Sequence, residues 1–217
     1  MENRFFAITA IACLAVGLHA ADTKRAGSWE MYLGPQYNMG KTLNLAHENS
    51  AKVNSSAALL FGFAYNFDEH ISLGFMFNST SANYKVSYRD EQGSDKTYSN
   101  SLYTSAFDLT AAYNFMEGAF TPYVMADLGM TYIDSGIPTG EEGTGCWWDP
   151  WYGYICAPVM STYSANKLNY GAQLGLRYDT QSAVFFKAGI GLSHVDLDGT
   201  GDDTFTLYNV LVGFKFR

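Results

Sequence analysis

Residues 206–216 of the 217-residue chain read TLYNVLVGFKF. Every second residue of this stretch belongs to a mostly apolar or aromatic series: Thr206, Tyr208, Val210, Val212, Phe214 and Phe216. The residues between them are more mixed: Leu207, Asn209, Leu211, Gly213 and Lys215. Successive side chains of a β-strand point to opposite faces, so the stretch predicts a strand with one apolar face and one more polar face.

The same alternation recurs about eight times along the chain. Seven earlier segments carry it, at about residues 28–37, 55–67, 71–88, 98–115, 121–133, 163–178 and 183–195. In the third segment the alternation changes phase near residues 79–83, which predicts that Phe77, Tyr84 and Val86 all face outward. After the N-terminal segment, no apolar run reaches the roughly 18 residues that a membrane helix needs.

The connections between these segments alternate between long and short. Long connections are predicted at residues 40–54, 89–97, 134–162 and 196–203, and short ones at 68–70, 117–118 and 179–182. Outer-membrane barrels have short periplasmic turns and long external loops. Each apolar stripe is also long enough for a tilted transmembrane strand of roughly 9 to 11 residues. The predicted fold is all-β: an eight-stranded antiparallel up-and-down transmembrane β-barrel with both termini in the periplasm.

The N-terminus has the features of an export signal. Arg4 precedes an apolar run over residues 5–17, and Leu18-His19-Ala20-Ala21 offers a cleavage site. Residues 1–21 are therefore predicted to be a cleaved signal peptide, with the cut after Ala20 or Ala21, and residues 22–217 the barrel domain. The alternative of a lipoprotein would modify Cys13, but the usual leucine is missing from that motif.

Composition and motifs exclude several functions. The net charge is −8, from 21 acidic and 13 basic side chains, which argues against nucleic acid as a partner. The sequence has no Gly-Xaa-Ser-Xaa-Gly elbow and no phosphate-binding loop, so no cofactor and no enzymatic activity are predicted. Ser193, His194 and Asp196 supply hydrolase residue types, but adjacent strand residues point to opposite faces. A lipid A hydrolase is therefore only a distant third hypothesis.

Removal of the signal leaves two cysteines, Cys146 and Cys156, close together in the longest predicted loop. In an oxidising compartment they are predicted to form a disulfide, with free thiols as the alternative. The aromatic residues around them are Trp147, Trp148, Trp151, Tyr152 and Tyr154. Such a density of aromatics predicts a binding surface for sugar or lipid, or alternatively a small core folded over the barrel mouth.

Six charged residues fall on the inward-facing phase of the predicted strands: Glu30, Asp108, Asp127, Arg177, Lys187 and Lys215. Glu30, Arg177 and Lys215 are expected near the periplasmic rim, and the other three higher in the lumen. Because a buried unpaired charge is costly, we expect pairing across the lumen. The charges would form a polar plug or, alternatively, a path for ions. Inward glycines leave room for bulky side chains such as Tyr32 and Tyr123, which predicts a packed interior; a thin passage is the alternative.

The last long connection is acidic. Asp196, Asp198, Asp202 and Asp203 alternate with Gly199 and Gly201, and clustered carboxylates are ligands that Ca²⁺ prefers. The spacing does not complete a calcium-binding loop, so a solvated acidic loop is the alternative.

Three stretches carry a resemblance to a known family. The alternating residues Tyr208, Val210, Val212, Phe214 and Phe216, followed here by Arg217, resemble the C-terminal assembly signal of bacterial outer-membrane proteins. Residues 65–74, YNFDEHISLG, and 120–124, FTPYV, resemble the small-barrel superfamily of OmpW, OmpX and OmpA-transmembrane types. The resemblance implies the outer membrane of a Gram-negative bacterium, with its lipid, lipopolysaccharide and assembly machinery as partners.

Two functions follow as hypotheses. The first is a non-enzymatic barrel that serves as a narrow, porin-like conduit or a binding protein for small apolar molecules. The second is a structural or adhesive surface protein that acts through its extracellular loops.

Overall fold

The computed structural model describes residues 24–44, 50–89, 95–149, 153–197 and 204–217. The predicted signal peptide lies outside these residues. The strands are β1 (Trp29–Asn38), β2 (Lys41–Asn44), β3 (Ser50–Val53), β4 (Ser56–Asn66), β5 (Ile71–Arg89), β6 (Asp95–Asn114), β7 (Phe120–Asp149), β8 (Gly153–Asp179), β9 (Val184–Val195) and β10 (Thr204–Phe216). Within the described ranges, no helix is long and apolar enough to cross a membrane.

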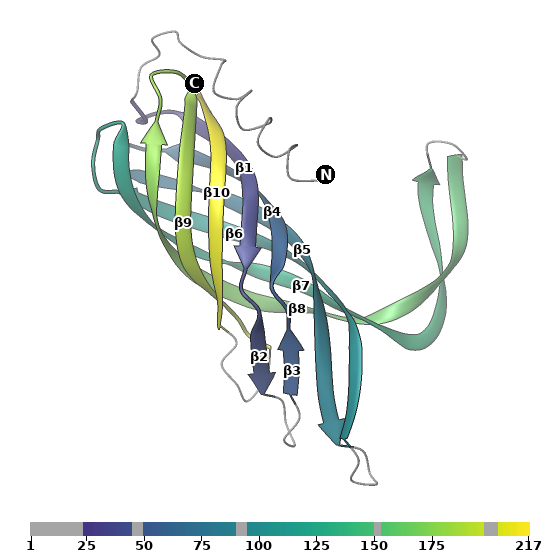
Figure 1. Cartoon of the computed structure of the whole chain (residues 1–217). Helices are drawn as coiled ribbons and strands as arrows, with labels where there is room; N and C mark the ends of the chain where they lie inside the picture. The colour runs from purple at the N-terminus through teal and green to yellow at the C-terminus, as the bar shows by residue number, and fades with distance from the viewer. Residues whose placement is uncertain (1–23, 45–49, 90–94, 150–152, 198–203) are drawn as a thin grey trace, which may run out of the picture.

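Eight of the strands close into a ring (Figure 1). Around it, β1 is followed by β4, β5, β6, β7, β8, β9 and β10, and β10 pairs with β1 again. In the closing pair, which is antiparallel, Trp29 lies opposite Phe216 and Leu33 opposite Val212. The prediction of an eight-stranded antiparallel barrel is confirmed. The alternating residues of β10 that the sequence assigned to the apolar face lie outside; Val210, for example, is 61% exposed.

Two predicted loops contain further strands. Within 40–54, which was expected to be a loop, β2 pairs with β3, and β3 pairs in turn with β5. Within 134–162, β7 and β8 continue as a long hairpin that extends well away from the ring (Figure 1). Both predictions of irregular loops were wrong. Beyond the membrane both faces of a strand can meet water, so polar residues occupy both and the period of two disappears from the sequence.

The predicted phase change in β5 was also wrong. The ladder between β5 and β6 runs without a break from Ile71 opposite Tyr113 to Arg89 opposite Asp95. Tyr84 therefore faces the interior, where it is 6% exposed, while Ser79 and Ser81 are exposed on the outside. The outward side chains change here from Phe75 and Phe77 to Ser79 and Ser81, as expected where a strand passes from lipid into water. The hydrophobic pattern inverts at that boundary although the strand does not slip.

The interior is packed at mid-height by a cluster of apolar side chains, which we call the packed layer. It contains Tyr32, Leu60, Ala64, Met76, Tyr123, Met125, Phe185 and Leu211. Glycines on neighbouring strands make space for the rings, because a Cβ on Gly62 would collide with the Tyr32 ring and one on Gly213 with the Phe185 ring. Leu60 and Phe185 are 0% exposed. At this level the lumen has the packed interior that the sequence predicted, not a thin passage.

Candidate functional site

A layer of buried charges lies between the packed layer and the end of the barrel that carries the chain termini. At its centre, the Arg177 guanidinium donates to both carboxylate oxygens of Glu30, at 2.6 and 3.1 Å. The same guanidinium also donates from Nε and Nη2 to the two oxygens of Asp179, each at 2.8 Å. All three side chains are 0% exposed. The planar guanidinium has several N–H donors and can therefore bind two carboxylates at once. A lysine ammonium could not make the same paired hydrogen bonds.

Two lysines complete this lower charge layer, which comprises Glu30, Arg177, Asp179, Lys187 and Lys215. Lys187 Nζ lies 3.3 Å from Glu30 Oε2, and Lys215 Nζ lies 3.0 Å from Asp179 Oδ1. Lys187 also lies 4.6 Å from the centre of the Tyr32 ring in the packed layer. The structure thus places Lys187 with the lower charges, whereas the sequence had placed it higher, with Asp108 and Asp127.

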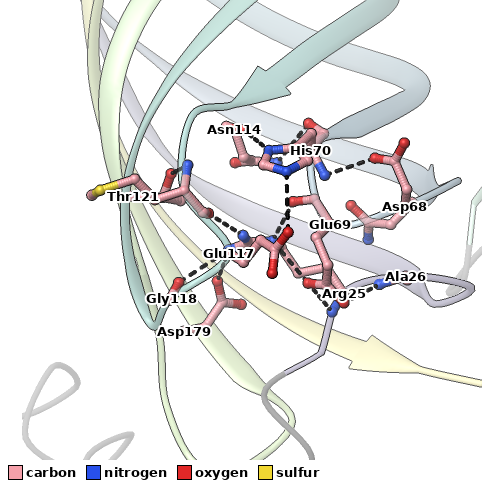
Figure 2. Close-up of polar contacts among 12 residues, drawn as sticks. Arg25, Ala26, Asp68, Glu69, His70, Asn114, Glu117, Gly118, Thr121 and Asp179 are labelled. Carbon is pink, nitrogen blue, oxygen red and sulfur yellow. Dashed lines mark hydrogen bonds and ion pairs between the residues drawn. The ribbon is translucent and has the colours of Figure 1, made fainter.

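Arg25, which precedes β1, joins Asp179 of this layer to the short turns at the same end of the barrel (Figure 2). Arg25 is 0% exposed and lies 2.9 Å from Asp179 through Nη1. It also donates to the backbone oxygens of Met116 and Glu69 in two different turns. Sequence reasoning missed both Arg25 and Asp179. Asp179 lies two residues after Arg177 and so shares its inward face, a signal that was available. Arg25 precedes the first strand, where no periodicity could have identified it.

The turn between β4 and β5 lies at this end of the barrel (Figure 2). Asp68 Oδ1 accepts the backbone N–H groups of His70 and Ile71, both at 2.7 Å. These hydrogen bonds favour the carboxylate and lower the pKa of Asp68 below its usual 3.8. The His70 ring contacts the next turn, with Nδ1 at 2.7 Å from the backbone oxygen of Asn114 and Nε2 at 3.5 Å from Glu117. The His70 ring thus ties the β4–β5 turn to the β6–β7 turn.

Above the packed layer, polar groups line one side of the lumen. Asp108 on β6 lies opposite Gly129 on β7, which lies opposite Asn169 on β8. Asp127, two residues from Gly129, is opposite Gly171. Asn169 donates from Nδ2 to Asp108 Oδ1 at 2.5 Å. No ion pair joins either aspartate to the lower charge layer in the part of the chain that the structure describes. The six predicted lumen charges therefore form two groups rather than one network.

These polar groups form the floor of a cavity of about 340 Å³, which we call the outer cavity. Its side walls are largely apolar and include Leu43, Val53, Ala82, Leu102, Ile133 and Leu207. Met76, a member of the packed layer, also lines it. A cavity of this size, with apolar walls and a few convergent polar groups, is typical of small-molecule binding sites.

Residues 8–216 match the family model described as the outer membrane protein beta-barrel domain. The chain belongs to this family. The outer-membrane barrel has no match among curated protein sequences.

Among solved structures, the barrel is similar to the outer membrane protein OprG from Pseudomonas aeruginosa, with 15% identity over 89% of this chain and 97% of that one, and a TM-score of 0.54. It is also similar to Ail, the attachment invasion locus protein of Yersinia pestis, in complex with the heparin analogue sucrose octasulfate. That match has 11% identity over 88% of this chain and 99% of Ail, with a TM-score of 0.50. These likenesses support the fold. The match to the family model supports a location in the bacterial outer membrane.

The hairpin of β7 and β8 carries the described part of the predicted aromatic surface. Trp148 is 73% exposed and Tyr154 is 70% exposed, and the two are partners in the ladder. Trp147 belongs to β7, whereas Trp151 and Tyr152 lie outside the described residues. Cys146 and Cys156 are directly opposite each other. Antiparallel partners are separated by about 4.5 to 5.5 Å between Cα atoms, a distance that a disulfide can bridge, so the disulfide remains a prediction with suitable geometry.

The remaining candidates in the outer-membrane barrel do not gather into a site. Asp198, Asp202 and Asp203 of the proposed calcium loop lie outside the described residues, and the described ones contain no cluster of three metal-binding side chains. Ser193 lines the outer cavity, whereas the His194 ring lies on the opposite face. There its Nδ1 is 3.3 Å from Thr204 and its centre 4.8 Å from the Tyr170 ring. Serine and histidine are thus not paired.

Proposed function

We propose that this outer-membrane barrel binds small, largely apolar molecules in its outer cavity and is not an enzyme. The observation that carries the proposal is the cavity itself, with apolar walls above a closed floor. An apolar molecule that enters it loses its contact with water, which stabilises the bound state by roughly 25 cal/mol per Å² of buried apolar surface. An ordinary aqueous pore would instead need a continuous polar lumen.

The direction of entry follows from the orientation of the barrel. The cavity lies at the end of the ring where β5–β6 and β7–β8 extend as long paired hairpins, and short turns lie at the opposite end. By the rule for outer-membrane barrels, the long connections are extracellular and both termini are periplasmic. The cavity would then receive its ligand from outside the cell.

A route out of the cavity is offered by the seam between β1 and β10. The ladder pairs Leu33 with Val212 and resumes with Gln36 and Asn209, without pairing Gly34 or Pro35 to β10. Proline has no backbone N–H to donate. Gln36 lines the cavity and Pro35 is exposed on the lipid-facing side. The two missing ladder pairs make this seam our candidate for a lateral route between the cavity and the membrane, which would suit a ligand that is soluble in lipid.

The test is retention of an apolar probe by the barrel in lipid nanodiscs. Binding of 1-naphthylmethanol is measured by equilibrium dialysis and corrected with empty nanodiscs. In Ala82→Trp the affinity should fall about tenfold, or about 1.4 kcal/mol, because the indole would occupy the cavity. Ser81→Trp is the matched control, because Ser81 lies outside on the same strand. Equal retention by wild type and Ala82→Trp would refute the proposal.

The alternative function, adhesion, is favoured by one observation. Among the described residues, the β7–β8 hairpin pairs only with itself beyond Asp134 and Ser164, and it presents Trp148 and Tyr154 to solvent. Exposed aromatic side chains on a projecting element are typical of contact surfaces. Replacing Trp147, Trp148 and Trp151 together would abolish binding of cells carrying the protein to host cells or matrix if adhesion is the function.

A further inference from the structure

The charged groups on the polar floor of the outer cavity are both carboxylates, which accept hydrogen bonds. Asp108 and Asp127 are the charged residues in the described lining, and both are acidic. Asp108 is 2% exposed, and its Oδ1 accepts from Asn169. Asp127 has no hydrogen bond or ion pair with any described residue. A lysine or arginine that would neutralise the two carboxylates is missing from the described lining.

Asn169 provides an independent observation at the same place. It is 2% exposed, and its Oδ1 is buried without a hydrogen-bond partner. Its Nδ2 is already donated to Asp108, which fixes the orientation of the amide, so that the free atom is an acceptor. Leaving a buried polar atom unpaired is unfavourable, so such atoms in folded proteins call for an explanation.

The strand register brings the Asp108 and Asp127 carboxylates close together. Asp108 and Asp127 occupy diagonal positions on neighbouring strands, because Asp127 is two residues from the Asp108 partner Gly129. A Cβ on Gly129 would collide with Asp108 Oδ1, and one on Gly171 would lie 2.6 Å from Asp127 Oδ2. Glycines at both positions give the carboxylates their space. The acceptor niche therefore consists of Asp108, Asp127 and Asn169, supported by two glycines.

We propose that the acceptor niche binds the protonated amine of an amphiphilic organic cation whose apolar part fills the outer cavity. An ammonium group has three donors and no acceptor, which complements carboxylate and amide oxygens. Charge-assisted hydrogen bonds to it are roughly twice as strong as neutral ones. The apolar walls provide the second half of the recognition. This inference rests on the proposed function and names its ligand class.

The experiment compares three probes that share one ring system: 1-naphthylmethylammonium, 1-naphthylmethanol and 1-naphthoate. Each is dialysed against the full-length mature barrel in zwitterionic nanodiscs and against empty nanodiscs. The wild-type barrel should bind the ammonium probe about tenfold more tightly than the alcohol and the carboxylate least, since one charge-assisted hydrogen bond is worth about that factor. In Asp108→Asn/Asp127→Asn the preference for ammonium should disappear while the alcohol still binds.

A matched control variant also removes two carboxylate charges, but far from the outer cavity. Asp68→Asn/Glu117→Gln lies in the turns at the opposite end of the barrel and should keep the preference. Resistance of each barrel to unfolding in cold sodium dodecyl sulfate establishes that the variants are folded. If ammonium and alcohol bind equally to wild type, the inference is overturned and the proposed function stands. If no probe binds, both fail. Competition by CaCl₂ without any selection among the probes would also overturn it, in favour of a site for a bare cation.

Discussion

At the scale of single residues, Arg177 holds the lower charge layer together. It bridges Glu30 and Asp179, and both carboxylates are 0% exposed. We expect Arg177→Met to destabilise the barrel by roughly 3–5 kcal/mol, because it leaves two buried carboxylates without their main partner. Urea unfolding of the barrel in lipid vesicles, followed by tryptophan fluorescence, measures the loss.

Two further variants separate charge from geometry at this position. Arg177→Lys keeps the charge but loses the fork, so its stability should fall between wild type and Arg177→Met. Lys52→Met removes a cation from an exposed site and should change stability by less than about 0.5 kcal/mol. Equal stability of Arg177→Met and Lys52→Met would contradict the role given to Arg177.

Asp68 gives a prediction about pH. The N–H groups of His70 and Ile71 stabilise its charged form, so its pKa in the folded barrel lies below the usual 3.8. A lowered pKa means that the contribution to stability is present above pH 3.8 and is lost as the pH falls through the folded-state value. Carboxyl ¹³C NMR titration of selectively labelled aspartate, assigned with Asp68→Asn, should find this low pKa. A midpoint at or above 3.8 would show that the turn hydrogen bonds are absent.

At the scale of elements, the sequence predicted well the strand segments that cross the membrane and poorly those that extend beyond it. The membrane part of β10 alternates because one face meets lipid and the other the lumen. In β5 the pattern inverts after Phe77, although its ladder with β6 is continuous. The long ends of β7 and β8 lack a consistent apolar face. The hydrophobic alternation of a strand depends on whether lipid, water or the lumen faces each side. A strand that passes from lipid into water can therefore resemble one whose register has shifted.

The β7–β8 hairpin should be dispensable for the barrel. Within the described ranges its outer part pairs only with itself, so replacing residues 139–161 with a short glycine-rich turn removes no ladder of the ring. We expect the shortened barrel to fold and to retain 1-naphthylmethanol as wild type does. Urea unfolding and dialysis of the two proteins side by side provide the measurement. Loss of folding would show that the hairpin belongs to the core structure, and loss of probe binding alone would place it at the cavity.

At the scale of the whole molecule, the lumen is divided into two compartments: a lower one in which cations pair with carboxylates, and an upper one whose charged residues are both acidic. Among the described residues, the lower end holds Arg25, Arg177, Lys187 and Lys215 against Glu30, Asp179 and Glu69, and the upper level holds Asp108 and Asp127. The sequence predicted which charges face inward, because strand alternation determines the face. It could not predict how they divide, since pairing depends on the register between strands and on Arg25, which lies outside every strand.

This division predicts a barrel that binds without conducting ions. The packed layer contains Leu60 and Phe185 at 0% exposure, and Arg25 and Arg177 close the lumen beneath it. We therefore expect no steady conductance steps in planar bilayers and no swelling of liposomes in small sugars, while the same preparation retains 1-naphthylmethanol. A general porin inserted into the same bilayers shows that the assay can detect a pore. Steady steps from the wild-type barrel would contradict the packed layer, and their loss in Lys187→Met would assign ion passage to the lower charge layer instead.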